Sequence, residues 1–110
     1  MNDSPFLMRV LTPTPFAIHE PVAGTTVKRA SHCIIRWETF PQFDIPKVVL
    51  LLFRFLKPQE EALGILELVP NTGIFTLHIP TDVEPGEHLI RVYSALNLAA
   101  SATSGPFTIE

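Results

Sequence analysis

The longest apolar run of the chain lies within Lys47-Val48-Val49-Leu50-Leu51-Leu52-Phe53-Arg54-Phe55-Leu56. Prolines precede and follow it, at positions 46 and 58. A short segment rich in valine, leucine and phenylalanine between such turn signals is typical of a strand in the middle of a sheet. We therefore predict a β-strand over residues 47–56 and expect the rest of the fold to be built around it.

Turn signals divide the rest of the chain into similar short segments. Eleven prolines and five glycines exclude long helices and coiled coils. In segment 27–38, Cys33, Ile35 and Trp37 share one face while more polar residues occupy the other, as in a half-buried antiparallel strand. Trp37 is predicted as a core residue rather than a sugar-stacking platform, and Cys33 as a small buried side chain. Strands are predicted at 16–18, 27–38, 47–56, 62–69, 74–79, 87–94 and 105–110.

These strands predict an all-β chain folded as one antiparallel β-sandwich of about seven strands. A chain of 110 residues is too short for two separate cores. Residues 1–15 are predicted as an extended, proline-rich N-terminal arm, and residues 16–110 as the sandwich domain. Within this domain we expect Leu63, Ile65 and Leu66 to be buried.

Composition excludes several functional classes. Hydrophobic residues make up 46% and charged residues 17% of the chain, which excludes intrinsic disorder. A net charge of -3 offers no basic surface for nucleic acid. The longest apolar run is far shorter than the roughly 20 residues that a membrane-spanning helix needs, so no membrane span is expected. The first residues do not resemble a secretory leader, which indicates either a cytoplasmic protein or a mature form whose leader was removed.

Four ordered motifs carry a resemblance to a known family. They are the edge Pro21-Val22-Ala23-Gly24, the strand end Ile35-Arg36-Trp37, the segment Asn71-Thr72-Gly73-Ile74-Phe75-Thr76-Leu77-His78-Ile79-Pro80, and Pro85-Gly86 followed by Ser104-Gly105-Pro106-Phe107-Thr108-Ile109. In this order they resemble the N-terminal immunoglobulin-like domain of fungal Kre/Knh-type cell-wall proteins, which also occurs in Ser-Thr-rich GPI-anchored proteins. The similarity covers residues 10–110.

The resemblance implies an immunoglobulin-like antiparallel β-sandwich from a fungus, located outside the cell and associated with cell-wall glycan. It implies no catalytic residues, so we expect a non-enzymatic binding module. Three features depart from the family: no leader, no Ser/Thr-rich tail with a lipid anchor, and His88 where the family often has tyrosine. The alternative is therefore a protein-interaction module, such as a defence or immunomodulatory effector, acting as a homodimer.

The strand over residues 47–56 is apolar on both faces. Val49, Leu51, Phe53 and Phe55 form one face, although a two-sheet sandwich needs only the opposite face for its core. Because a bare apolar face favours aggregation, we predict that these four residues form a homodimer interface. In the alternative, apolar residues of the chain's beginning cover the face: Phe6, Leu7, Met8 and Phe16. An arm exchanged between subunits would satisfy both ideas.

The loop over residues 39–46 is the candidate ligand-binding site. An up-and-down tracing places it at the same end of the sandwich as segments 70–73 and 95–103, where immunoglobulin-like folds carry binding loops. Aromatic rings could stack on a sugar while the polar side chains donate or accept hydrogen bonds. The predicted ligand-binding residues are Phe40, Gln42, Phe43, Asp44 and Asn97. In the alternative, the two phenylalanines only close the end of the sandwich.

No constellation of residues points to catalysis. The chain has no Gly-x-Ser-x-Gly nucleophile elbow and no phosphate-binding loop, and the carboxylates of Glu60 and Glu61 are adjacent in a turn. His32 and His78 fall on outward positions of different strands, so a shared metal site would need those strands to be neighbours in register. We predict no catalytic residue, no metal site and no cofactor.

Overall fold

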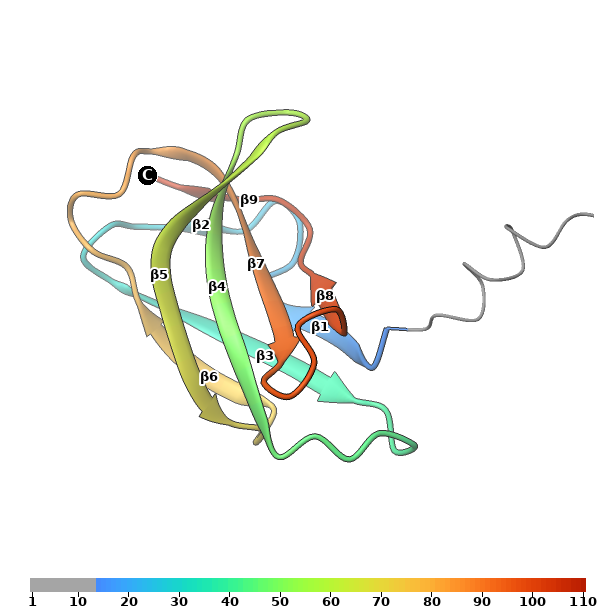
Figure 1. The fold of residues 1–110 in the computed structure, drawn as a ribbon. Coiled ribbons are helices and arrows are strands. Elements are labelled where there is room, and N and C mark those ends of the chain that lie inside the picture. Colours follow the sequence, from blue (N-terminus) through green and yellow to red (C-terminus); the bar gives the residue numbers. More distant parts are fainter. Residues whose placement is uncertain (1–13) are drawn as a thin grey trace, which may run out of the picture.

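The computed structural model describes residues 14–110, which form nine strands in two sheets (Figure 1). The smaller sheet has the order β1-β3-β6, and the larger has the order β2-β9-β7-β4-β5, with β8 also paired to β7. The prediction of an all-β sandwich is confirmed. The strands are β1 Phe16–Glu20, β2 Thr26–Val27, β3 His32–Thr39, β4 Lys47–Phe55, β5 Glu60–Pro70, β6 Ile74–His78, β7 Gly86–Ser94, β8 Ser101–Thr103 and β9 Phe107–Ile109.

The core lies between the two sheets and is built by alternation along the strands. On β3 the buried side chains are Cys33, Ile35 and Trp37, as the sequence predicts. On β4 the even-numbered residues 48, 50 and 52 face this core and are almost completely buried. Burial of one such aliphatic side chain stabilises the fold by about 1.5–3 kcal/mol relative to exposure. The alternation therefore fixes which face of each sheet points inward.

The prediction of a single strand over residues 27–38 is wrong. The chain forms β2, leaves the larger sheet through residues 28–31, and enters the smaller sheet as β3. β2 pairs with β9 in parallel, whereas β3 pairs antiparallel with β1 and β6. At the crossing, Ala30 has a φ of 60°, a conformation that a continuous strand does not adopt. One strand thus becomes two because the chain changes sheets.

A bulge in β5, with three residues opposite one on β4, changes which of its leucines are buried. Leu51 lies opposite Leu66 and Phe53 lies opposite Ala62, so residues 63–65 face Leu52 alone. Gly64, at the centre of the bulge, has a φ of 75°, which glycine adopts at little cost. Leu63 and Ile65 pack against the core, but Leu66 is 54% exposed, which corrects the prediction that it is buried.

The segment predicted as a loop over residues 95–103 contains β8, which accounts with β2 for the nine strands instead of about seven. The predicted arm over residues 1–15 lies outside the described residues except for Thr14 and Pro15. The Oγ1 atom of Thr14 donates a hydrogen bond to the carbonyl oxygen of Ser101 at 2.6 Å. Phe16 is buried in the core between the sheets, so it does not cover the outer side of β4.

Candidate functional site

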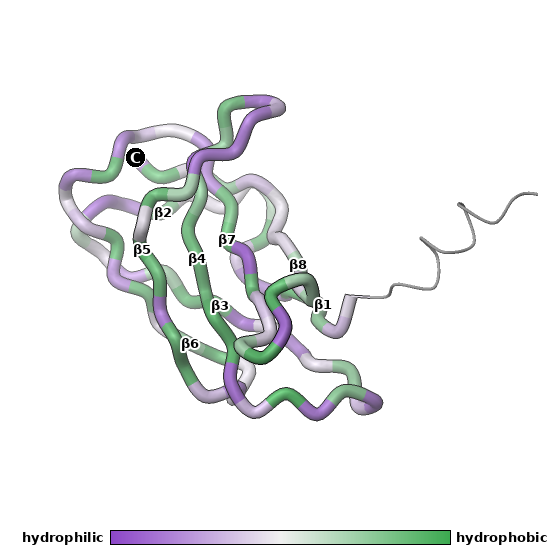
Figure 2. Tube along the Cα trace, in the orientation of Figure 1, coloured by the Kyte–Doolittle hydropathy of each residue, from purple (hydrophilic) through white to green (hydrophobic). Residues whose placement is uncertain are grey.

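The outer face of the larger sheet carries a continuous apolar surface. Paired residues on neighbouring antiparallel strands lie on the same face, and two such rows cross β5, β4 and β7. One row places Val49 between Leu68 and Tyr93, and the next places Leu51 between Leu66 and Arg91, so the apolar residues of the two rows are Val49, Leu51, Leu66, Leu68 and Tyr93. Leu66 and Leu68 are 54% and 58% exposed. We call these five residues the outer patch. Figure 2 shows apolar residues along this part of β4 and β5.

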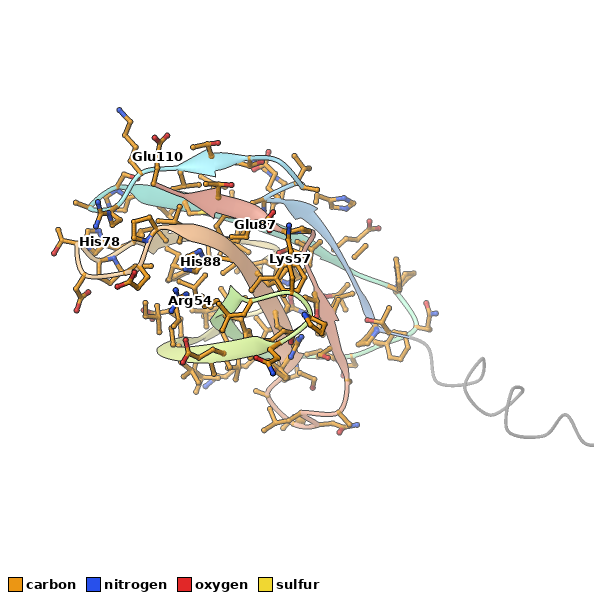
Figure 3. The ribbon with its side chains drawn as sticks, turned by 90° about the horizontal axis from the view of Figure 1, so that it is seen from above. Arg54, Lys57, His78, Glu87, His88 and Glu110 are labelled. Carbon is orange, nitrogen blue, oxygen red and sulfur yellow. The ribbon has the colours of Figure 1, made fainter. Side chains whose placement is uncertain are left out.

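The loop between β7 and β8 extends this surface. Leu96 and Leu98 are 77% and 62% exposed, the two most exposed large hydrophobic residues in the described chain. Viewed from above in Figure 3, the loop projects beyond β4 and β5 on the side away from the smaller sheet. The loop therefore lies on the same side of the molecule as the outer face of the larger sheet.

The other half of the predicted dimer interface is already covered within the chain. Phe53 is only 8% exposed because the Cζ atom of Arg91 lies 4.5 Å from the centre of its ring. Arg91 is held there by a hydrogen bond from its Nε to the Oγ1 of Thr103 at 2.7 Å and by an ion pair with Glu60 at 2.5 Å. Phe55 is half-buried at the same end of β4. Val49 and Leu51 are thus the predicted residues that border the exposed leucines.

The predicted loop site is brought together in part. Phe43 and Asn97 line one hollow of about 260 Å³, together with Thr14 and residues 99–101. Asn97 uses its Oδ1 to accept a hydrogen bond from the backbone nitrogen of Ala99 at 3.1 Å. Phe40 lies outside the hollow's lining and is half-buried. Gln42 and Asp44 are exposed on the same loop.

Asn71 holds this end of the sandwich together, and sequence reasoning missed it. Its Oδ1 accepts a hydrogen bond from the indole nitrogen of Trp37 at 2.7 Å. Its Nδ2 donates to the Oγ1 of Thr39 and to the carbonyl oxygen of Ile45, both at 2.8 Å. One amide thus joins β3, the β3–β4 loop and the β5–β6 turn. The Asn71-Thr72-Gly73 turn was a visible signal, but it gave no indication of the partners.

His88 is fully buried on the inner face of β7. Its Nδ1 lies 2.8 Å from the carbonyl oxygen of Gly86, while its Nε2 has no hydrogen-bond partner within residues 14–110. Burial lowers the pKa of His88 from the ordinary value of 6.5; the Gly86 carbonyl opposes this shift, and Arg54 on the neighbouring strand adds to it (Figure 3). A neutral histidine is therefore part of the core.

Cys33 behaves as a core residue and not as a reactive thiol. It is 4% exposed, and burial, assisted by the negative charge of Glu20, raises the pKa of its thiol to about 11. The thiolate is the reactive form of cysteine, so this environment suppresses nucleophilic and metal-binding chemistry at Cys33.

The exposed histidines lie on the outer face of the smaller sheet. His19 of β1 contacts Glu38 at 3.2 Å, and His32 and His78 face each other across β3 and β6. No group of three or more histidine, cysteine, aspartate or glutamate side chains in residues 14–110 is placed to hold a metal ion together. This stretch also contains no helix that is long and apolar enough to cross a membrane.

Comparisons with protein-family models, with curated proteins and with solved structures gave no match to this chain. The geometry of its own surfaces is therefore the basis for a functional proposal.

Proposed function

We propose that the chain is a non-enzymatic, immunoglobulin-like binding module that acts through protein contact, with a second copy of itself as the partner. The observation that carries this proposal is the outer patch with the neighbouring Leu96 and Leu98. Together they leave four leucines more than half exposed on one side of the larger sheet. Single exposed hydrophobic residues are ordinary on protein surfaces, but a contiguous group of this kind marks a contact surface.

The energy available from this surface is sufficient for a specific dimer. Completing the burial of one half-exposed leucine contributes about 1 kcal/mol, so four of them on each subunit contribute about 8 kcal/mol to a symmetric pair. Val49, Leu51 and Tyr93 add further contact area. Association itself costs several kcal/mol, and a dissociation constant of about 1 μM corresponds to roughly 8 kcal/mol of net free energy. Because the cost of association offsets part of the burial energy, the expected outcome is a weak dimer with a dissociation constant above about 1 μM.

A second copy fits the outer patch better than a charged partner does. None of its five residues carries a charge, and the one charged residue in the two rows, Arg91 beside Leu51, is already paired with Glu60. A two-fold symmetric contact also closes on itself and leaves no apolar surface free for further growth. The rim is supplied by Arg91 and Glu60, which already neutralise each other within one chain.

The test is the molar mass in solution, measured by light scattering for the wild type and two matched variants. Leu68→Glu places a charge in the outer patch, and Ile74→Glu places one on the outer face of the smaller sheet, where Ile74 is similarly exposed at 46%. We expect a wild-type dimer, a folded Leu68→Glu monomer and a dimeric Ile74→Glu variant. A monomeric wild type at all accessible concentrations would contradict the proposal.

Glycan binding at the loop end is the second candidate function. It is supported by the hollow that Phe43 and Asn97 share, and by the motifs that resemble fungal cell-wall domains. Titration with a β-1,3-glucan oligosaccharide, followed by NMR, tests it. Phe43→Ala should abolish the shifts, whereas Phe55→Ala, a half-buried phenylalanine outside the hollow, should leave them unchanged. Absence of any shift in the wild type would exclude this candidate for that glycan.

A further inference from the structure

The outer face of the smaller sheet contains a pair of histidines in direct register. His32 begins β3, His78 ends β6, and the two are cross-strand partners. The adjoining pair is hydrogen-bonded, because the nitrogen of Ile79 donates to the carbonyl oxygen of Ser31 at 2.8 Å. Hydrogen-bonded and non-hydrogen-bonded pairs alternate along an antiparallel ladder, so His32 and His78 form a non-hydrogen-bonded pair, whose side chains approach most closely.

The two imidazole rings are already spaced as they would be on a single ion. Their centres are 5.3 Å apart and their planes are tilted by 59°. With metal–nitrogen bonds of about 2.0–2.1 Å and a tetrahedral angle at the ion, two coordinated imidazoles have ring centres roughly 5 Å apart. The distance between the two ring centres thus matches that of two imidazoles bound to one ion.

We propose that His32 and His78 chelate one divalent transition-metal ion of the Cu²⁺, Ni²⁺ or Zn²⁺ class. Imidazole nitrogen suits these ions, whereas Ca²⁺ and Mg²⁺ prefer oxygen ligands. The pair supplies two ligands and leaves the remaining positions to water, so the site is open and exchanges its ion readily. The ordinary order of stabilities makes Cu²⁺ the tightest of the three.

Both rings are available to an ion from solution. His32 and His78 are exposed, and neither takes part in an ion pair or side-chain hydrogen bond described for residues 14–110. The third exposed histidine, His19, instead contacts Glu38 and has no histidine opposite it, since the neighbour of Ile18 across the ladder is Trp37 and that of Glu20 is Arg36. His19 is therefore a matched control: the same residue type, exposed on the same sheet, but unpaired with a second imidazole.

The bound ion would act as a cross-link between β3 and β6. The two histidines are 46 positions apart in the sequence and meet only in the folded chain. An ion that binds the folded chain more tightly than the unfolded chain stabilises the fold. The site thus predicts a rise in Tm with added ion, a readout that does not depend on any activity.

Calorimetric titration with CuCl₂ tests the proposal on the wild type and on His32→Gln, His78→Gln, the double variant and His19→Gln. Either single substitution should weaken the Cu²⁺ affinity at least about tenfold, because the second imidazole is then no longer held beside the first at high effective concentration. The double variant should lose little more than each single variant. His19→Gln should retain wild-type affinity, and MgCl₂ should give no binding.

Thermal unfolding provides the second readout. Cu²⁺ should raise the Tm of the wild type and of His19→Gln but not that of the His32 or His78 variants, while all variants unfold at similar temperatures without metal because the substituted side chains are exposed. Equal weakening of Cu²⁺ binding by His19→Gln would overturn the proposal. So would single variants that stay within about twofold of the wild-type affinity, since chelation requires both rings.

Discussion

The outer faces of the two sheets expose similar apolar side chains but arrange them differently. On the smaller sheet, Ile34 and Ile74 are 47% and 46% exposed, and each lies opposite a polar partner, Thr76 and Arg36 respectively. On the larger sheet, Leu68 lies beside Val49 and Leu66 beside Leu51, and β7 continues these two rows with Tyr93 and Arg91. We therefore expect the arrangement of exposed apolar residues, more than their number, to distinguish the proposed contact surface from an ordinary one.

The larger sheet also differs along its own length. Near the β4–β5 hairpin, Arg91 covers Phe53 and is fixed by Thr103 and Glu60. Toward the other end of β4, Val49 lies between Leu68 and Tyr93, and Leu51 lies between Leu66 and Arg91. On the outer face of β4, Phe53 is therefore buried within the chain, whereas Val49 and Leu51 are only half-buried. The alternation of the sequence alone does not distinguish these two parts of the strand.

The largest expected effect is the difference in unfolding free energy between substitutions on the inner and on the outer face of the larger sheet. Leu50→Ala on the inner face should lower the free energy of unfolding by about 3 kcal/mol, because Leu50 is 1% exposed and its removal leaves a cavity. Leu68→Ala should cost less than about 1 kcal/mol at a concentration where the chain is monomeric. Urea unfolding of both variants checks this. Equal losses would show that Leu68 is covered within one chain.

A smaller effect is expected when the covered part of the outer face is opened. Arg91→Ala should lower the free energy of unfolding by about 1–2 kcal/mol, because it removes a charged hydrogen-bond network and exposes Phe53. Arg91→Ala should also strengthen self-association by extending the apolar surface.

The matched control is Arg36→Ala, which breaks a 3.6 Å ion pair with Glu20 on the smaller sheet and should change stability by less than about 0.5 kcal/mol. Unfolding and sedimentation together measure both effects, and unchanged association of Arg91→Ala would contradict this account of the surface.

The smallest expected effect is on the pH dependence of stability, where the buried His88 is compared with the exposed His19. The pKa of His88 in the folded chain lies below its ordinary value of 6.5. Between these two values the unfolded chain binds more protons than the folded chain, so stability falls as the pH drops from about 6.5. His88→Leu should reduce the slope of stability against pH in this range by at most one proton, whereas His19→Gln should leave the contribution of His88 intact. Urea midpoints measured from pH 7 downward test it, and a curve of unchanged slope in His88→Leu would contradict it.

The strands and the buried face of the sandwich could be predicted from the sequence because alternation on β3 and β4 reports which side chains point inward. The sheet change at residues 28–31 could not, since a turn into the opposite sheet and a continued strand have the same local pattern. The exposure of Leu66 was missed because Gly64 shifts the alternation of β5, and the sequence does not show where a bulge falls.

The candidate sites were predictable only where they depend on single loops. The sequence placed Phe43 on an end loop, but its meeting with Asn97 is a property of how distant loops pack. The outward positions of His32 and His78 were also visible, whereas their pairing depends on the register of β3 and β6. Register over such separations is fixed by the whole core, and no short motif records it.

We propose that the outer patch is the contact surface of this chain. The most direct test is to follow the backbone amide shifts of the wild-type protein by NMR as the protein is diluted. We expect concentration-dependent shifts confined to β4, β5, β7 and the loop that carries Leu96 and Leu98. Shifts centred on β1, β3 and β6, or spectra that do not change over the full concentration range, would contradict it.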